Sequence, residues 1–271
     1  MANFALMNTT SEFMADGRTF HGVIPLIMGT RLEMLVIDTE EAVMGPVWNR
    51  LCLEAEHLNS ILNRYDPDSE LTRLNCSDAP MQVSGTLASL IRLAIRCSER
   101  TLGLFDISKG HFRDISVTED DVAFTGGYPL DFGGIAKGYL LSRLKEKLVL
   151  RGVKCAFVDF GSSSILTMGH HPYGDCWKVG VQNPFGYGAL AEVELNGQSM
   201  STSGNTPSHG LHIIDPRTGL PNNDRKAVTV IADDPLDAEV VSTALMLADD
   251  GMKAGILAHF PGLTEKTFTI R

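Results

Sequence analysis

Apolar residues recur at helical spacing in several segments of the chain, and shorter apolar or alternating runs lie between these segments. The longest helix is expected where five apolar residues fall on one face, at Val43, Val47, Leu51, Leu58 and Leu62. Helices are expected over residues 40–62, 85–102 and 135–150, and as a final pair after residue 234. Strands are expected over residues 32–37, 153–160, 177–181, 191–195 and 227–231.

Strands and helices alternate irregularly, without internal repeats or an obvious linker. This order predicts an α/β to α+β fold with one compact domain over residues 26–271, built on a mixed, largely antiparallel sheet with flanking helices. The alternation of apolar and polar residues over 191–195 predicts antiparallel pairing with one solvated face. Residues 1–20 are polar and aperiodic, so we expect an N-terminal arm over residues 1–25.

The composition is that of a globular protein and argues against nucleic acids or anionic membranes as partners. The 271 residues carry a formal net charge of −10 and contain no basic cluster. The five cysteines are dispersed and fit free thiols better than a disulfide framework. No apolar stretch approaches the roughly 20 residues of a membrane helix, and residues 1–18 lack the features of a signal peptide. The sequence as given therefore predicts a cytoplasmic protein without a membrane span.

The stretch from Asp131 to Tyr139 combines a carboxylate, a glycine pair and a lysine at an expected helix start. Gly133 and Gly134 allow a sharp turn and a close approach of the backbone to a ligand. The helix N-terminus, with Lys137 in its first turn, would favour a bound phosphate. The alternative is an ordinary glycine turn, capped by Asp131, beside a solvated lysine.

Two further pieces suggest metal and acid–base chemistry. Glu239 and Thr243 stand four residues apart on an expected helix, so both side chains emerge on one face and could bind one hard cation through oxygen. They could equally be a solvated surface residue and a core residue. His212 precedes an apolar pair in an expected strand, where it could take a proton from an attacking hydroxyl or be satisfied by neighbouring backbone.

Aromatic side chains supply candidates for binding a flat heterocycle. Phe105 and Asp106 follow a glycine closely, and Tyr65 lies in a turn that begins at Arg64. Their rings and carboxylate are of the kind that such a ligand needs, although aromatic residues more often fill cores.

Taken together and in this order, the pieces resemble the FAD:protein FMN transferase (ApbE) family. The most specific are the stretch Asp131 to Tyr139 and the stretch His212-Ile213-Ile214-Asp215-Pro216-Arg217-Thr218-Gly219. The others are Met28-Gly29-Thr30, Tyr65, the stretch Asp68 to Asn75, Phe105-Asp106, Thr202-Ser203-Gly204 and Ser242-Thr243-Ala244. The resemblance covers roughly residues 26–250.

The resemblance implies a magnesium-dependent transferase that binds FAD, transfers its FMN moiety to a Thr or Ser hydroxyl of an acceptor protein, and releases AMP. By position, the residues implied to line the FAD site are Met28, Tyr65, Leu104, Phe105, Asp106, Asp131, Lys137, His212 and Ile213. The residues implied to hold Mg²⁺ are Gly134, through its backbone carbonyl, Glu239 and Thr243. His212 is implied as the catalytic base. Many family members are exported lipoproteins, so a preceding leader would imply a periplasmic or membrane-anchored protein.

Three features depart from the family pattern. Glu239 stands where the family usually has Asp, and its extra methylene would shift a bound metal by roughly an ångström. The family's Asn-x-Gly-Gly stretch reads Asp159-Phe160-Gly161-Ser162, which adds a negative charge and a side chain. The segments before Asp131 and between Gly204 and His212 are short. Two alternatives therefore stay open: a non-catalytic FAD-binding protein, and an FAD pyrophosphatase that gives FMN and AMP.

Overall fold

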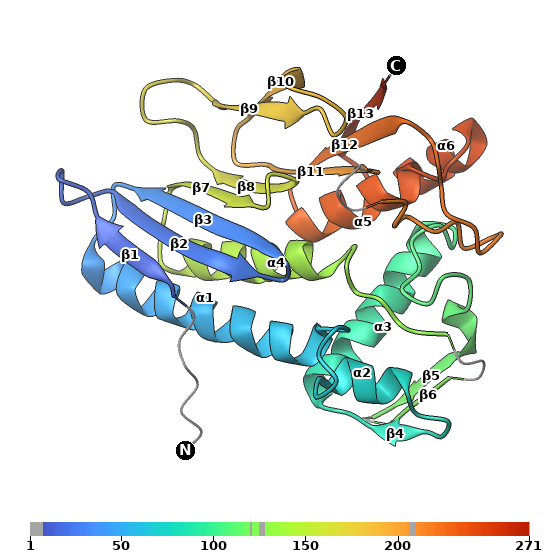
Figure 1. The fold of residues 1–271 in the computed structure, drawn as a ribbon. Coiled ribbons are helices and arrows are strands. Elements are labelled where there is room, and N and C mark those ends of the chain that lie inside the picture. Colours follow the sequence, from blue (N-terminus) through green and yellow to red (C-terminus); the bar gives the residue numbers. More distant parts are fainter. Residues whose placement is uncertain (1–7, 120, 125–127, 206–209, 271) are drawn as a thin grey trace.

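An eight-stranded sheet dominates the computed structural model, which describes residues 8–119, 121–124, 128–205 and 210–270 (Figure 1). Its strands lie in the order β1-β2-β3-β7-β8-β11-β12-β13. Their bounds are β1 Thr10–Phe13, β2 Phe20–Ile27, β3 Thr30–Ile37, β7 Cys155–Phe160, β8 Ser164–Met168, β11 Ser199–Gly204, β12 Lys226–Ala232 and β13 Thr264–Thr269. Every neighbouring pair in this order is antiparallel, which confirms the expected largely antiparallel sheet.

Helices cover one face of this sheet and a hairpin covers the other. The helices are α1 (Glu41–Leu62), which packs on β2, α4 (Ala136–Leu150), which packs on β8, and α5 (Pro235–Leu245), which packs on β8, β11 and β12. The hairpin consists of β9 (Trp177–Gln182) and β10 (Ala189–Leu195), which pair antiparallel as expected. Its buried side chains form a second hydrophobic cluster with residues of β8, β11 and β12.

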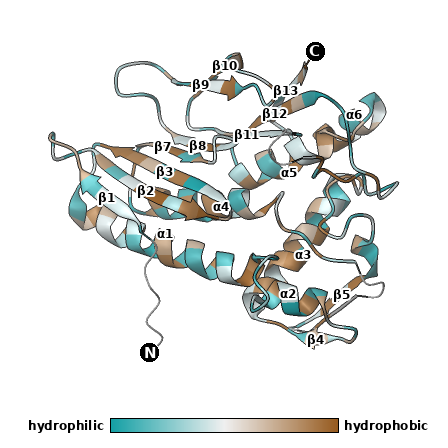
Figure 2. Ribbon diagram, in the orientation of Figure 1, coloured by the Kyte–Doolittle hydropathy of each residue, from teal (hydrophilic) through white to brown (hydrophobic). Residues whose placement is uncertain are grey.

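The hydrophobic core therefore lies on both sides of the sheet. Ile165 and Leu166 are successive residues of β8 and are 2% and 0% exposed, but the first belongs to the hairpin cluster and the second to the larger helix cluster. They separate in this way because successive side chains of a strand point to opposite faces. Figure 2 shows the matching concentration of hydrophobic residues in the central strands.

A smaller lobe lies beside the C-terminal end of α1, at the lower right of Figure 1. It holds α2 (Glu70–Asn75), α3 (Gly85–Arg100) and a three-stranded sheet of order β4-β6-β5. The strands are β4 Met81–Gln82, β5 Ile115–Thr118 and β6 Asp121–Phe124, and a 3₁₀ turn at Phe112–Asp114 precedes β5. The Ser84 hydroxyl caps α3, as the sequence predicts, by accepting the Leu87 N–H at 3.2 Å.

The last helix, α6 (Asp250–His259), follows α5 as the second member of the expected C-terminal pair. Searched across the described residues, the helices include none with the length and apolar character needed to cross a membrane.

Residues 10–25 differ from the N-terminal arm expected over residues 1–25. β1 and β2 form one edge of the main sheet, and Phe20 and Ile24 are 3% and 0% exposed. The four residues of β1 are largely exposed and carry no apolar pattern that would predict a strand. In β2, Gly22 interrupts the apolar alternation because the indole ring of Trp48 fills the space where its side chain would be. Residues 1–7 of the expected arm lie outside the described residues.

α4 and α5 approach each other closely because Gly138 has no side chain. A Cβ atom at this position would lie 2.7 Å from Glu239 Oε2 and 2.8 Å from the Pro235 carbonyl oxygen. Since contacts of that length require neighbouring atoms to move, any larger residue would push the two helices apart.

We expect Gly138→Ala to lower the free energy of unfolding by about 1–3 kcal/mol because of this overlap. The matched control is Gly45→Ala in α1, where an added Cβ would meet nothing within 4 Å. Alanine there should leave stability unchanged or raise it by about 0.5–1 kcal/mol, since glycine is the poorer helix former. Urea unfolding of both variants checks the prediction, and equal shifts in the two would contradict the close approach of α4 and α5.

Candidate active site

The start of α4 is capped from another helix. Ile135 occupies the N-cap position and its side chain makes no capping hydrogen bond. The N–H of Gly138, one of the amides that lacks a partner within its own helix, instead donates to Oε2 of Glu239 in α5. Glu239 is 4% exposed, and burial raises the pKa of its carboxyl group, although Lys137 and the Gly138 N–H oppose that rise.

Lys137 connects this carboxylate to the turn between β7 and β8. Its Nζ lies 3.6 Å from Glu239 Oε1 and donates to the hydroxyls of Ser163 at 2.6 Å and Ser164 at 2.9 Å. The Lys137 side chain is 19% exposed. One ammonium group therefore joins α4, α5 and the β7–β8 turn.

Thr243 lies one helical turn after Glu239 and faces the glycine turn before α4. Its hydroxyl donates to the Glu239 carbonyl at 3.1 Å and lies 3.2 Å from the hydroxyl of Ser203 in β11. A Cβ atom on Gly134 would lie 3.5 Å from Thr243 Oγ1. Gly134 and Thr243 therefore lie close together, and Glu239 lies one turn before Thr243 on α5; the resemblance implies these three residues as metal ligands.

The chemistry of these donors fits a hard cation. A carboxylate, a hydroxyl and a backbone carbonyl are oxygen ligands of the kind that Mg²⁺ accepts, with water and substrate oxygens completing its coordination. The carboxylate of Glu239 is engaged by Gly138 and Lys137, so it would reach a cation beside Thr243 only by turning away from α4. Within the described residues no group of three or more His, Cys, Asp or Glu side chains could hold a metal, so a cage of such side chains is not formed there.

Asp131 organises a second charged group on the side of the smaller lobe. Its Oδ1 accepts the Gly133 N–H at 3.0 Å, so it caps the glycine turn. Its Oδ2 pairs with Arg64 and lies 3.9 Å from Lys109 Nζ. Arg64 also donates to the hydroxyl of Tyr65 at 2.7 Å, and Tyr65 is 81% exposed. Two cations therefore lie beside Asp131, and the exposed ring of Tyr65 lies against one of them, Arg64.

The carboxylate of Asp106 holds its own loop rather than pointing to an open surface. It accepts hydrogen bonds from the N–H and hydroxyl of Ser108, at 2.7 and 2.6 Å, and from the N–H of Gly110 at 2.8 Å. Gly110 has a φ of +119° and abuts the carbonyl of Pro216, where a side chain would overlap it. The Asp131 N–H donates to the carbonyl of Ile107 at 2.8 Å. This loop therefore joins the Asp131 stretch to the segment after His212.

His212 lies in an irregular segment and not in the apolar strand that the sequence suggested. The neighbouring Ile214 forms an isolated bridge with Pro221. The His212 side chain is exposed, and its Nδ1 lies 3.3 Å from the Gly210 carbonyl oxygen. Ile213 is 6% exposed and anchors the segment in the core.

Arg217 fixes the turn that follows this segment. Its guanidinium group donates to both carboxylate oxygens of Asp215 and to the Leu247 carbonyl at 3.0 Å, beyond the end of α5. The hydrogen bonds from Arg217 hold the pKa of Asp215 below its usual range. The segment that carries His212 is thus tied to the residues that directly follow α5, the helix of Glu239 and Thr243.

The apolar residues implied for the FAD site lie in the hydrophobic core or pack against it. Leu104 and Phe105 are 1% and 3% exposed and belong to the main core cluster. The ring of Phe105 lies against Gly134, where an added Cβ would be 3.3 Å away. Met28 packs against the same cluster from the β2–β3 turn, with a φ of +50°.

The β7–β8 turn shows why glycine would suit the position of Ser162. Gly161 and Ser162 both adopt left-handed backbone conformations, with φ of +70° and +60°. A side chain at Gly161 would lie 2.6 Å from the hydroxyl oxygen of Thr30. Asp159 accepts the Ser162 N–H at 2.6 Å and stabilises the turn, while burial raises the pKa of the Asp159 carboxyl group.

Several residues around the site were not assigned from the sequence. No sequence pattern marked Lys109 as a site residue, because a single lysine in a loop is usually solvated. Ser163 and Ser164 follow the strand expected over residues 153–160, but no sequence pattern indicated that they bind Lys137. Gly138 could have been found, since a glycine inside an amphipathic helix often marks close packing.

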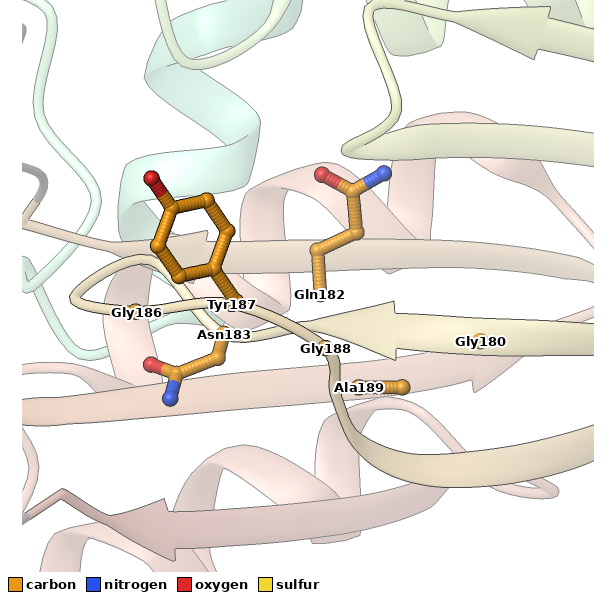
Figure 3. Close-up of a pocket in the computed structure, with 7 residues that line it drawn as sticks. All are labelled: Gly180, Gln182, Asn183, Gly186, Tyr187, Gly188 and Ala189. Atoms are coloured by element: carbon orange, nitrogen blue, oxygen red, sulfur yellow. The ribbon is translucent and has the colours of Figure 1, made fainter.

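Two surface hollows lie away from these residues. The larger, about 530 Å³, is shown in Figure 3 and is formed around the turn of the β9–β10 hairpin. Its lining residues are Gly180, Gln182, Asn183, Gly186, Tyr187, Gly188 and Ala189. The other, about 340 Å³, is lined by Glu99, Arg100 and His259. Neither hollow includes a residue implied for FAD or for a metal.

Comparison of the sequence with known proteins identifies relatives. The chain matches the model of the ApbE family over residues 28–121 and 108–262. An FAD:protein FMN transferase of Treponema pallidum is 28% identical over 261 residues, which cover 75% of this chain and 71% of the relative. An FAD:protein FMN transferase of Klebsiella pneumoniae is 34% identical over 129 residues, but the match spans only 44% of this chain and 39% of that relative.

Solved structures show the same fold. The flavin transferase ApbE from Vibrio cholerae superposes with a TM-score of 0.76 at 21% identity and covers 94% of this chain and 93% of its own. The ApbE protein from Thermotoga maritima gives a TM-score of 0.73 at 22% identity, with 85% and 87% covered. These likenesses establish the fold, and the expected compact arrangement of helices around one sheet is confirmed.

We expect Ser162→Gly to raise the free energy of unfolding, by up to about 1 kcal/mol. The left-handed conformation costs a non-glycine residue about 1–2 kcal/mol, and part of this gain is offset by the greater freedom of glycine in the unfolded chain. Ser163→Gly is the control, because Ser163 has an ordinary φ and binds Lys137, so its replacement should destabilise the protein. Thermal unfolding checks both, and a loss of stability in Ser162→Gly would contradict strain at this turn.

Proposed function

The chain belongs to the ApbE family, and from that premise we propose that it transfers the FMN moiety of FAD to a Thr or Ser hydroxyl of an acceptor protein and releases AMP. The observation that carries the proposal is the convergence of Gly134, Glu239 and Thr243 with Lys137 at the start of α4. A helix N-terminus, a lysine and hard oxygen donors together suit a pyrophosphate and its cation.

The charges around the site support binding of the two phosphates. Lys137 lies in the first turn of α4, where the helix dipole adds to its own positive charge. Arg64 and Lys109 lie beside Asp131, whose carboxylate caps the glycine turn. The exposed ring of Tyr65 offers a face on which a flavin or adenine ring could stack.

The reaction needs one base and one leaving group. The acceptor hydroxyl oxygen attacks the phosphorus of the FMN half, the bond from that phosphorus to the bridging oxygen breaks, and AMP leaves with the bridging oxygen. We assign the hydroxyl proton to His212. If Nδ1 of His212 donates its hydrogen to the Gly210 carbonyl, Nε2 is the atom that accepts the proton. The exposure of His212 suits an acceptor that is itself a protein.

The proposed metal ligands are the Gly134 carbonyl, Glu239 and Thr243. A bound Mg²⁺ would neutralise charge on the phosphates as the leaving group departs. Residues of the chain would orient the phosphates, hold the acceptor hydroxyl in line with the leaving group and accept its proton.

The direct test is to titrate FAD into metal-stripped protein by calorimetry, repeat the titration with Mg²⁺, and measure AMP and the mass of an acceptor protein. One FMN added to the acceptor for each AMP released supports the transferase. AMP with free FMN and no modified acceptor would indicate the pyrophosphatase instead. FAD binding without AMP would indicate the non-catalytic flavin-binding protein, and absence of FAD binding would reject all three.

We expect His212→Ala to lower the rate of FMN transfer by about 10²–10⁴-fold, because a positioned base contributes that much. The dissociation constant of FAD should change little, since the phosphates are held by other residues. His57→Ala is the control, as His57 is exposed on α1 and lies 3.5 Å from Thr86 of the smaller lobe. Mass spectrometry of the acceptor measures transfer, and an unchanged rate in His212→Ala would remove this residue as the base.

A further inference from the structure

The buried carboxylate of Glu239 is neutralised by groups of its own chain. Lys137 Nζ lies 3.6 Å from Oε1, and the Gly138 N–H donates to Oε2. Glu239 is 4% exposed, and a charge at that depth is strongly unfavourable without a paired cation. Lys137 therefore stabilises the carboxylate of Glu239 in its buried position.

The length of the glutamate side chain makes these contacts possible. An aspartate at position 239 would be one methylene shorter and would end about 1.5 Å further from α4. The missing side chain of Gly138 completes the fit, since a Cβ there would lie 3.0 Å from Glu239 Cβ. Glutamate at this position therefore reaches the start of α4, whereas aspartate in the same backbone would not.

Lys137 also has partners that do not depend on Glu239. The hydroxyls of Ser163 and Ser164 accept its hydrogens at 2.6 and 2.9 Å. If the Glu239 carboxylate turned toward Thr243, the ammonium group would stay anchored on the β7–β8 turn. The carboxylate can thus change partners without unfolding either helix.

We propose that Lys137 and a divalent cation compete for the carboxylate of Glu239, so that Lys137 acts as an internal substitute for the metal and lowers its affinity. The inference rests on the metal site of the proposed function. When the cation takes the carboxylate, Lys137 keeps a positive charge that Glu239 no longer neutralises, beside the expected phosphate position. Metal binding then favours phosphate binding, and by linkage the reverse also holds.

The experiment measures binding of Mg²⁺ alone to the purified chain, by thermal unfolding in EDTA and across a series of MgCl₂ concentrations. Lys137→Met should have a lower unfolding midpoint than wild type in EDTA, because Glu239 loses its cation. Its midpoint should rise more steeply with Mg²⁺, giving an apparent dissociation constant at least about fivefold tighter than wild type.

Lys145→Met is the matched control. Lys145 lies on the same helix, and its Nζ donates to the backbone carbonyls of Gly197 and Asp233, at 3.3 and 2.5 Å. Its replacement should cost stability without changing the affinity for Mg²⁺. If Lys137→Met binds Mg²⁺ no more tightly than wild type, or shows no response to Mg²⁺, the competition is wrong.

A double-mutant cycle supplies a second readout. Glu239→Asp should tighten Mg²⁺ binding because the shorter carboxylate no longer reaches Lys137. Adding Lys137→Met to that variant should then change the affinity less than about twofold, since the two substitutions remove the same contact. Equal tightening by Lys137→Met in both backgrounds would overturn the proposal. Should Lys137→Met fail to fold, Lys137→Gln replaces it, because an amide retains a donor for the two serines.

These titrations contain neither FAD nor acceptor, so their outcome is independent of the transferase test. Glu239→Gln should abolish the response to Mg²⁺. An unchanged response in that variant would show that Glu239 is not a metal ligand, and the proposed competition would then be wrong. The transfer reaction would still be tested by its own assay.

Discussion

The carboxylate of Glu239 is buried in the core, so polar or charged groups of the protein have to lie close enough to stabilise it. The solution uses the N–H of Gly138 and the ammonium group of Lys137, both from the first turn of α4. It requires a glycine at position 138, because any other side chain would occupy the space of the carboxylate. The close packing of α4 on α5, the orientation of Lys137 and the capping of α4 all follow from this one contact.

The remaining groups of the site are arranged around that contact in two sets. On the sheet side, Lys137, Ser163 and Ser203 are part-buried and held by hydrogen bonds from several elements. On the side of the smaller lobe, Arg64 and Tyr65 are more open, and Arg64 pairs with Asp131. The loop that ends at Gly110 links the second set to the segment after His212. The sheet side is thus held by several hydrogen bonds, whereas the side of the smaller lobe is more exposed.

The sequence predicts the parts of the fold that carry long apolar patterns, and it fails where a strand or a contact depends on distant neighbours. α1, α3, α4 and α5 lie close to their expected positions because their apolar faces repeat over several turns. β1 is four residues long and polar, and it is a strand only because β2 lies beside it. Among the site residues, the spacing of Glu239 and Thr243 places both on one helix, but spacing carries no information on which cation the carboxylate faces. That depends on Gly138 and Lys137, which belong to a different helix.

The contacts that complete the site join positions far apart in the chain. Gly138 and Glu239 are 101 residues apart, and Arg64 and Asp131 are 67 apart. Contacts of such separation form late, because the entropy of closing a long loop has to be overcome first. Because the chain is synthesised from its N-terminus, α4 is made before α5. Glu239 can therefore cap the first turn of α4 only after α5 has been made. Assembly of the site is therefore expected late in folding, and a chain that has formed only the β2–β3 hairpin and α1 would still lack the contacts of Gly134, Glu239 and Thr243.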